Sequence, residues 1–206
     1  MSEALKPKIV ICEGPDGCGK TTIATKLASY LDAPVLNSPS RTNSVSFLRK
    51  ITKYEKGYNA FERQCLHTIS NLVDFFEEFD CARNLVLDRS HLSTYIYGIT
   101  EGADHAKMEV LMDIHSKITS LWIDKYDVHV YLFSAEKRFG VADESHHEKN
   151  LSWNNLKNNY ALWEEKPFSL FSYKERVTLV QVDGKSIDQI YTEVLNDMEG
   201  LCSKRR

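Results

Sequence analysis

Hydrophobic residues along the chain fall into two patterns that alternate from one end to the other. The first pattern is a short, almost wholly apolar run, which is typical of a strand buried on both faces of a sheet. Such runs lie at residues 8–14, 33–37, 84–90, 127–133 and 177–184. The second pattern repeats apolar residues at helical spacing and predicts helices. It covers residues 20–31, 61–79, 92–98, 106–123, 151–165 and 186–201.

This alternation predicts an α/β fold in which helices cover both faces of a parallel sheet. The chain has 206 residues, enough for one α/β domain, and it contains no internal repeat and no low-complexity linker. We therefore predict a single domain over residues 1–206. Residues 135–149 are polar and mixed in charge, and we predict that they form a mobile lid.

The segment 61–79 carries an apolar stripe on one side of its predicted helix. The stripe consists of Cys65, Leu66, Ile69, Leu72, Val73 and Phe76. This face, like that of residues 91–99, either packs inside the chain or forms the contact of a homodimer. The pattern alone leaves both alternatives open.

Composition and charge limit the kinds of molecule that the chain is expected to bind. The net charge is −3, so nothing global favours a nucleic acid, and a small anionic ligand needs a local basic site. Five cysteines form no C-x-x-C pair, which is typical of a reducing compartment. No run approaches 18 apolar residues, so we expect no membrane partner and a cytoplasmic protein.

Residues 14–21 read Gly-Pro-Asp-Gly-Cys-Gly-Lys-Thr and fit the pattern G-x-x-x-x-G-K-[ST] between a predicted strand and a predicted helix. In this setting backbone N–H groups and the helix N-terminus bind phosphate, Lys20 reaches the β- and γ-phosphates, and the Thr21 hydroxyl binds Mg²⁺. The alternative is a glycine-rich turn with an exposed lysine. The residues that we expect to bind the nucleoside triphosphate here are Gly14, Asp16, Gly17, Cys18, Gly19, Lys20, Thr21 and Thr22.

A triphosphate site can serve a GTPase, a motor ATPase or a kinase. The chain has no N-K-x-D stretch for guanine and is short for a motor, which favours a small-molecule kinase. Asp88 ends a predicted buried strand, where ligands bind in open α/β sheets. Its carboxylate can hold Mg²⁺ through water, and Arg89 beside it can bind an acceptor phosphate. The alternative is an Asp–Arg pair that only caps a helix.

Two further segments carry positive charge toward the same region. Arg41 follows the second predicted strand, where an acceptor would lie, although an exposed loop arginine is an alternative. Lys137 and Arg138 lie in the predicted lid and can close over the transferred phosphoryl group. A solvated charge run is the alternative for the lid residues.

Several of these segments together resemble the thymidylate kinase family of P-loop nucleoside monophosphate kinases. They are ICEGPDGCGKTT, SPSRT, LDRSHLSTYIYG and the polar segment before LSWNNLKNNYALWEE. The resemblance runs from about residue 8 to the end of the chain. It implies a three-layer α/β/α P-loop NTPase fold with a five-stranded parallel sheet of order 2-3-1-4-5. It also implies ATP and Mg²⁺ as cofactors and a deoxynucleoside monophosphate as acceptor.

The resemblance assigns roles to individual positions. Asp16 matches the residue that binds the sugar 3′-hydroxyl, and Arg41 and Arg89 match those that hold the acceptor phosphate. Ser93 and Tyr97 match positions near the base and sugar. The family's catalytic arginine, absent from the GCGK loop, is matched by Arg138 of the lid. The turn Asp183-Gly184-Lys185 matches the place where the adenine of ATP is read.

One part of the chain departs from the family. In the third helix the family places an aromatic that stacks on thymine and an arginine that reads its carbonyl, and the matching positions here are Thr68 and Leu72. Asn71 lies between them and is our candidate for base contact, with Gln64 and His67 as the nearest other polar groups. A different base, or several bases, is therefore compatible with the sequence.

We therefore predict the reaction MgATP + dNMP → ADP + dNDP, in which positioning and charge neutralisation carry the catalysis. A deoxynucleoside kinase is the first alternative, but it needs a carboxylate beside the acceptor hydroxyl, and residues 36–43 carry an arginine and no acid. A kinase acting on a modified base in a nucleic acid would require a basic groove. A non-enzymatic nucleotide switch would have no use for two acceptor arginines.

Overall fold

The computed structural model describes residues 6–37, 44–54, 57–78, 83–136, 153–165 and 175–200. Three of the predictions fall outside these ranges. Arg41 and Arg138 are not among the described residues, and neither is the predicted lid beyond its first two positions. Their proposed roles therefore stay predictions.

Five parallel strands form one sheet in the order β2-β3-β1-β4-β5. They are β1 (Lys8–Glu13), β2 (Val35–Asn37), β3 (Leu85–Asp88), β4 (Asp127–Ser134) and β5 (Glu175–Gln181). Each lies within or beside one of the predicted apolar runs. The predicted fold class and strand order are therefore confirmed.

Seven helices are present in the described ranges. They are α1 (Lys20–Leu31), α2 (Phe47–Tyr54), α3 (Ala60–Glu78), α4 (His91–Thr100), α5 (His105–Ile123), α6 (Trp153–Glu165) and α7 (Ile187–Met198). The apolar pattern predicted all of them except α2, a short helix whose first residue, Phe47, is exposed. None of the described helices is long and apolar enough to cross a membrane.

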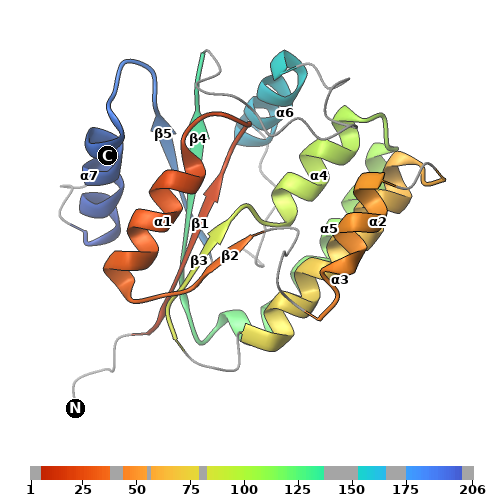
Figure 1. Ribbon diagram of the computed structural model, residues 1–206, viewed down its shortest axis with the longest axis horizontal. Coiled ribbons are helices and arrows are strands. Elements are labelled where there is room, and N and C mark those ends of the chain that lie inside the picture. Colours follow the sequence, from red (N-terminus) through yellow and green to blue (C-terminus); the bar gives the residue numbers. More distant parts are fainter. Residues whose placement is uncertain are drawn as a thin grey trace.

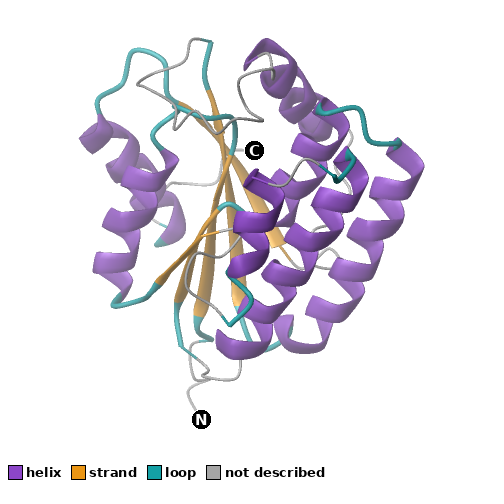
Figure 2. Cartoon of the chain, turned by 45° about the vertical axis from the view of Figure 1, so that its right-hand side comes forward, coloured by secondary structure: helices purple, strands orange, loops and turns teal. Residues whose placement is uncertain are grey.

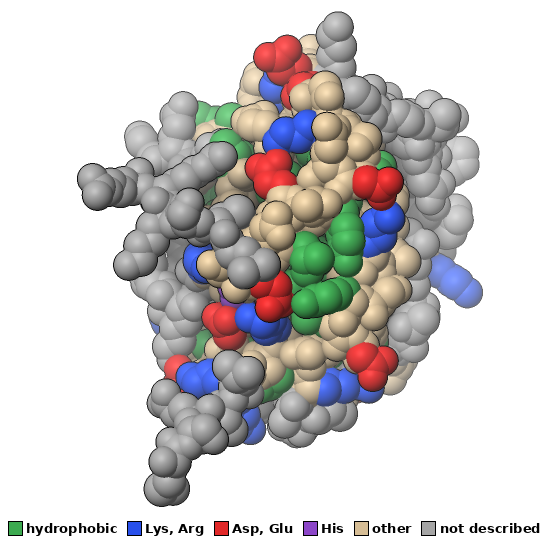
Figure 3. Space-filling model, turned by 90° about the vertical axis from the view of Figure 1, so that its left-hand side faces the viewer, with side chains coloured by type: hydrophobic (Ala, Val, Ile, Leu, Met, Phe, Trp, Pro, Cys, Tyr) green, Lys and Arg blue, Asp and Glu red, His purple; other side chains and the backbone are tan. Residues whose placement is uncertain are grey.

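The sheet separates two hydrophobic cores, because successive side chains of a strand point to opposite faces. Ile9 and Ile11 of β1 pack with residues of α3, α4, α5 and α6, whereas Val10 and Cys12 pack with α1 and α7. Figures 1 and 2 show the sheet between these two helical layers. On the face that carries α1 and α7, basic and acidic side chains are interspersed among the described residues (Figure 3).

The third strand stops at the residue that the sequence predicted as its end. The structure ends β3 at Asp88, because Arg89 adopts a left-handed backbone conformation with φ of 78°. Ser90 then caps α4, and its hydroxyl accepts a hydrogen bond from the backbone N–H of Leu92. The turn brings Asp88, Arg89 and the start of α4 to the carboxyl end of the sheet, beside the loop that follows β1.

Candidate active site

The loop after β1 requires glycine at its first position. Gly14 has a φ of 135°, and a Cβ atom there would lie 2.3 Å from the carbonyl oxygen of Phe133 on β4. Gly17 and Gly19 also have positive φ angles, of 78° and 84°. The loop therefore turns tightly from β1 into α1 and leaves its backbone N–H groups at a helix N-terminus, as the glycine spacing predicted.

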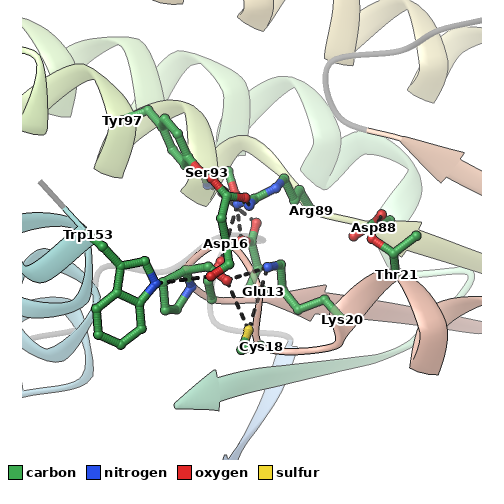
Figure 4. A network of polar contacts seen from close by, with 12 residues as sticks. Glu13, Asp16, Cys18, Lys20, Thr21, Asp88, Arg89, Ser93, Tyr97 and Trp153 are labelled. Atoms are coloured by element: carbon green, nitrogen blue, oxygen red, sulfur yellow. Dashed lines mark hydrogen bonds and ion pairs between the residues drawn. The ribbon is translucent and has the colours of Figure 1, made fainter. Parts of the chain in front are cut away.

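Lys20 is buried at the start of α1 and lies across this loop (Figure 4). Its ammonium group donates a hydrogen bond of 2.6 Å to the carbonyl oxygen of Pro15 and lies 3.6 Å from the sulfur of Cys18. The Cys18 thiol donates to the same carbonyl at 2.9 Å. The one buried cation of α1 is thus held at the centre of the loop by neutral acceptors.

Thr21 and Asp88 meet where α1 begins and β3 ends. The Thr21 hydroxyl donates a hydrogen bond of 2.7 Å to Oδ2 of Asp88. The other carboxylate oxygen, Oδ1, is buried and has no hydrogen-bond partner among the described residues. Thr22, the next residue of α1, is exposed.

The guanidinium group of Arg89 is the centre of a polar network beside the loop (Figure 4). One terminal nitrogen donates to Asp16 and, at 3.2 Å, to the Tyr97 hydroxyl. The other donates to the Ser93 hydroxyl at 2.9 Å and to the carbonyl oxygen of Gly14 at 3.2 Å. The sequence-predicted residues Asp16, Ser93 and Tyr97 therefore all converge on Arg89.

The network fixes the charge state of its members. Burial by itself would raise the pKa of the Asp16 carboxyl, but Arg89 and Lys20 together with the 2.5 Å hydrogen bond from Tyr97 hold it below its usual range. Burial would lower the pKa of Arg89, whereas the surrounding Tyr97 and Asp16 raise it well above its ordinary value. Asp16 is thus a carboxylate and Arg89 a cation at neutral pH.

Three residues of this network were not predicted. Glu13 is fully buried at the end of β1 and accepts hydrogen bonds from the hydroxyls of Ser90 and Ser93, both at 2.7 Å. On α6, Tyr160 contacts Ser93 at 2.9 Å, and the indole N–H of Trp153 donates to the backbone carbonyl of Asp16 at 3.0 Å. A charge at the end of an apolar run was the only available signal, and it pointed to Glu13 alone.

The third helix does not bury its apolar stripe. Ile69 and Phe76 are 47% and 50% exposed, and the buried positions of α3 are mainly polar. These buried polar residues are Gln64, Thr68, Ser70, Asn71 and Asp74. Of the two positions matched to the family's base contacts, Thr68 is buried and Leu72 is half-buried. The face of residues 91–99, in contrast, is buried inside the chain.

A pocket lies between α3 and the carboxyl ends of β2 and β3. It is lined by Leu36, Asn37, Asn71, Asp74, Phe75, Leu87, Arg89, Ser90 and His91. The predicted contact residue Asn71 is among them, and its amide donates a hydrogen bond of 3.2 Å to the Thr94 hydroxyl. His67 lies elsewhere, with its Nε2 atom 2.7 Å from the Thr52 hydroxyl on α2.

The turn after β5 lies beside the start of α1, because the Cβ position of Gly19 is 3.3 Å from a methyl group of Ile187. Within this turn Asp183 accepts a hydrogen bond of 2.8 Å from the backbone N–H of Glu136. Lys185 forms an ion pair with Glu193 of α7 at 2.5 Å. The turn is therefore near the loop, while its two predicted side chains contact protein groups.

Comparison with known proteins agrees with this geometry. No family model matches the chain. A probable thymidylate kinase from Methanococcus maripaludis is 27% identical over 191 residues, covering 92% of this chain and 94% of that protein. A second, from Methanococcus aeolicus, is 25% identical over 200 residues, covering 93% and 95%.

Among solved structures, the thymidylate kinase of Candida albicans superposes with a TM-score of 0.69 at 18% identity, covering 97% of this chain and 94% of that one. The thymidylate kinase of Ehrlichia chaffeensis gives a TM-score of 0.66 at 18% identity, covering 94% and 99%. The resemblance to thymidylate kinases that the motifs indicated is thus confirmed over nearly the whole chain, together with the P-loop fold.

Proposed function

We propose that the chain is an ATP-dependent kinase that phosphorylates a deoxynucleoside 5′-monophosphate, in the reaction MgATP + dNMP → ADP + dNDP. One observation carries the proposal. Arg89 hydrogen-bonds to the phosphate-binding loop through Gly14 and Asp16, and it also lines the pocket beneath α3. An anion held by Arg89 would therefore lie between the donor loop and a pocket for the rest of the acceptor. The names of the sequence relatives support the same reaction.

On the donor side, the loop amides and Lys20 would bind the phosphates of ATP. The neutral contacts of Lys20 with Pro15 and Cys18 are weaker partners for an ammonium group than a phosphate oxygen. Asp183 and Lys185 would lie toward the adenine. Each now contacts protein groups, so reading of the adenine would require these contacts to rearrange.

Thr21 and Asp88 fit a Mg²⁺ site. Magnesium takes hydroxyl, carboxylate and water oxygens, and the buried Oδ1 atom of Asp88 has no protein partner among the described residues. When bound there, the ion neutralises charge on the donor phosphates. Thr21 and Asp88 orient each other through their 2.7 Å hydrogen bond.

On the acceptor side, Arg89 would bind the phosphate of the dNMP with its planar donor fork. A monophosphate is already an ionised nucleophile, so the site needs no general base. Asp16 and Tyr97 would hold Arg89 in place and contact the sugar, with Ser93 beside them. Arg41 would be a second acceptor-phosphate cation, and Arg138 would bring charge from the lid to the transferred group.

The reaction is tested by measuring ADP release from MgATP with each dNMP, each deoxynucleoside, an oligonucleotide and no acceptor. We expect ADP release with one or more of the monophosphates. Release with a deoxynucleoside, with the oligonucleotide or without an acceptor should be much slower. Release only with deoxynucleosides would identify a nucleoside kinase instead. Release that is independent of any acceptor would identify a nucleotide switch.

A homodimer is proposed from the outward face of α3. Ile69 and Phe76 of this helix are exposed, and so are Val110 and Ile114 of the neighbouring helix α5. Burying such a surface against a second copy would remove apolar area from water. Sedimentation of the wild type at twice the chain mass, and of Phe76→Glu at the chain mass, is the expected result. A monomeric wild type would overturn it.

A further inference from the structure

The polar side of α3 places a carboxylate and an amide at the same wall of the acceptor pocket. Asn71 and Asp74 are three residues apart and therefore lie on one face of the helix. Their exposed fractions are 3% and 8%, so both are largely shielded from bulk water. A carboxylate this buried is uncommon in a folded protein, and Asp74 lies where the pocket reaches it.

The position of Arg89 determines which way a bound nucleotide would be oriented in the pocket. Arg89, Ser90 and His91 line it from the turn after β3, whereas Asn71 and Asp74 line it from α3. The 5′-phosphate of the acceptor would be held at Arg89 under the proposed function, on which this inference rests. The nucleoside would then extend away from the phosphate-binding loop, toward the wall that carries Asn71 and Asp74. The pocket as it stands has room for about one water molecule, so entry of the nucleoside requires α3 to move away from the sheet.

A carboxylate only accepts hydrogen bonds, so it recognises donors on a base. Cytosine, adenine and guanine each carry an exocyclic amino group, whereas thymine and uracil carry a carbonyl oxygen in the place of the cytosine amino group. Pairing of Asp with the N4 amino group of cytosine is a common mode of base recognition. A carbonyl oxygen at the same place would face a negative charge in a site with little water.

We propose that Asp74 accepts a hydrogen bond from the exocyclic amino group of the acceptor base, so that the enzyme prefers an amino-bearing dNMP over dTMP. Asn71 supports this recognition without setting it. Its amide group donates one hydrogen bond to Thr94, and because an amide carries both donors and an acceptor it is compatible with either kind of base edge. Asp74 is therefore the residue that determines specificity.

The test compares pairs of nucleotides in which one member carries an exocyclic amino group at a position where the other member does not. dCMP is compared with dUMP, and dGMP with dIMP, as acceptors of the wild-type enzyme. We expect the amino-bearing member of at least one pair to have a kcat/KM about tenfold higher or more, as one good base contact predicts. Binding of each nucleotide without ATP, measured by calorimetry, should show the same preference.

Asp74→Asn keeps the size of the side chain and adds a donor, so it should lower that ratio by about tenfold or more. Because the ratio compares two ligands on the same folded molecules, partial unfolding of the variant does not change it. Asp113→Asn is the matched control, since Asp113 is an exposed residue of α5 that pairs with Lys117. It should leave the ratio unchanged.

The outcomes separate this inference from the proposed reaction. Efficient use of dTMP and dUMP with no preference for either amino-bearing nucleotide would overturn the role of Asp74 and leave the kinase intact. A wild-type preference that Asp74→Asn does not change would do the same. Absence of phosphoryl transfer to every dNMP would overturn the kinase proposal and this inference with it.

Discussion

Helices α1 and α3 bury opposite kinds of side chain. On α1 the buried set is Lys20 followed by Ile23, Ala24, Leu27 and Ala28, which pack on the sheet as the apolar spacing predicts. On α3 the buried set is mainly polar, and Phe75 is its one large apolar member among the residues classed as buried. The apolar residues Ile69 and Phe76 of α3 point outward instead.

The difference separates the tasks of the two helices. Burial of aliphatic side chains stabilises a fold by roughly 1.5–3 kcal/mol for each. Among the described residues of α3, the Thr68 hydroxyl and the side-chain oxygen of Gln64 are buried without a hydrogen-bond partner, and such burial costs about 1–3 kcal/mol for each group. A helix that turns polar groups inward, while it has apolar residues to offer, therefore serves a ligand more than it serves stability.

The largest effect is expected at Lys20, the member of the α1 set that we propose binds the donor phosphates. Lys20→Ala should lower turnover by about a thousandfold or more, because the cation aimed at the donor phosphates is lost. The melting temperature should change little. Lys26→Ala is the control, since Lys26 is a half-buried lysine of the same helix that pairs with Asp188 outside the phosphate-binding loop. Near-normal turnover of Lys20→Ala would show that Lys20 has no catalytic role.

Stability should respond to α1 more than to the outer side of α3. Leu27→Ala removes a fully buried side chain and should cost about 2–5 kcal/mol of unfolding free energy. Ile69→Ala removes a half-exposed one and should cost roughly 1 kcal/mol or less in the monomer. Urea titrations of the two variants measure both values. Equal losses would mean that the two helices stabilise the chain alike.

Acid should destabilise the region of α3 through His67. Burial, and then the nearby Arg49 and Arg63, lower the pKa of His67 to about 4. The unfolded chain, with an ordinary pKa near 6.5, therefore binds more protons between these values, and stability falls as the pH drops from about 6.5 toward 4.

Replacement His67→Gln should remove part of that loss, on the order of 2 kcal/mol at pH 4.5. Thermal melts of both proteins from pH 7.5 to 4.5 measure it. The exposed His105 is the control, and His105→Gln should leave the pH dependence unchanged. Parallel pH curves for wild type and His67→Gln would contradict the assignment.

The smallest expected effect is on stability, and it compares a buried hydroxyl that has a hydrogen-bond partner with a buried hydroxyl that has none among the described residues. Among the described residues the Thr68 hydroxyl is buried and has no hydrogen-bond partner, so Thr68→Val should stabilise the chain by about 1 kcal/mol. The Thr94 hydroxyl accepts from Asn71, so Thr94→Val should destabilise it by about 1 kcal/mol. Changes of the same sign in the two melts would contradict this reading of α3.

The sequence predicted the sheet and the phosphate-binding loop because both depend on local signals. A strand covered on both faces must be apolar, and the Cβ clash at Gly14 excludes every other residue. Asp16 and Arg89 could be placed together because Arg89 directly follows β3, Asp16 lies in the loop that follows the neighbouring strand β1, and parallel strands end at one edge.

Other parts of the site depend on which way a helix is rotated about its axis, which composition does not determine. For α3 the apolar stripe was conspicuous, yet the polar face turned inward, and Asp74 was missed for that reason. Tyr160 and Trp153 were missed because an aromatic residue in an amphipathic helix is typical of a core. Glu13 was missed although its charge lies near the end of an apolar run.

The left-handed backbone conformation of Arg89 lowers the stability of the fold. A side chain in that conformation costs roughly 1–2 kcal/mol relative to the right-handed region, and glycine would avoid the cost. Evolution toward stability alone would therefore tend to erase the guanidinium group. Under the proposed function, its retention in a lineage is a sign of continued selection for phosphoryl transfer, and its loss would be an early mark of a copy that has acquired another function.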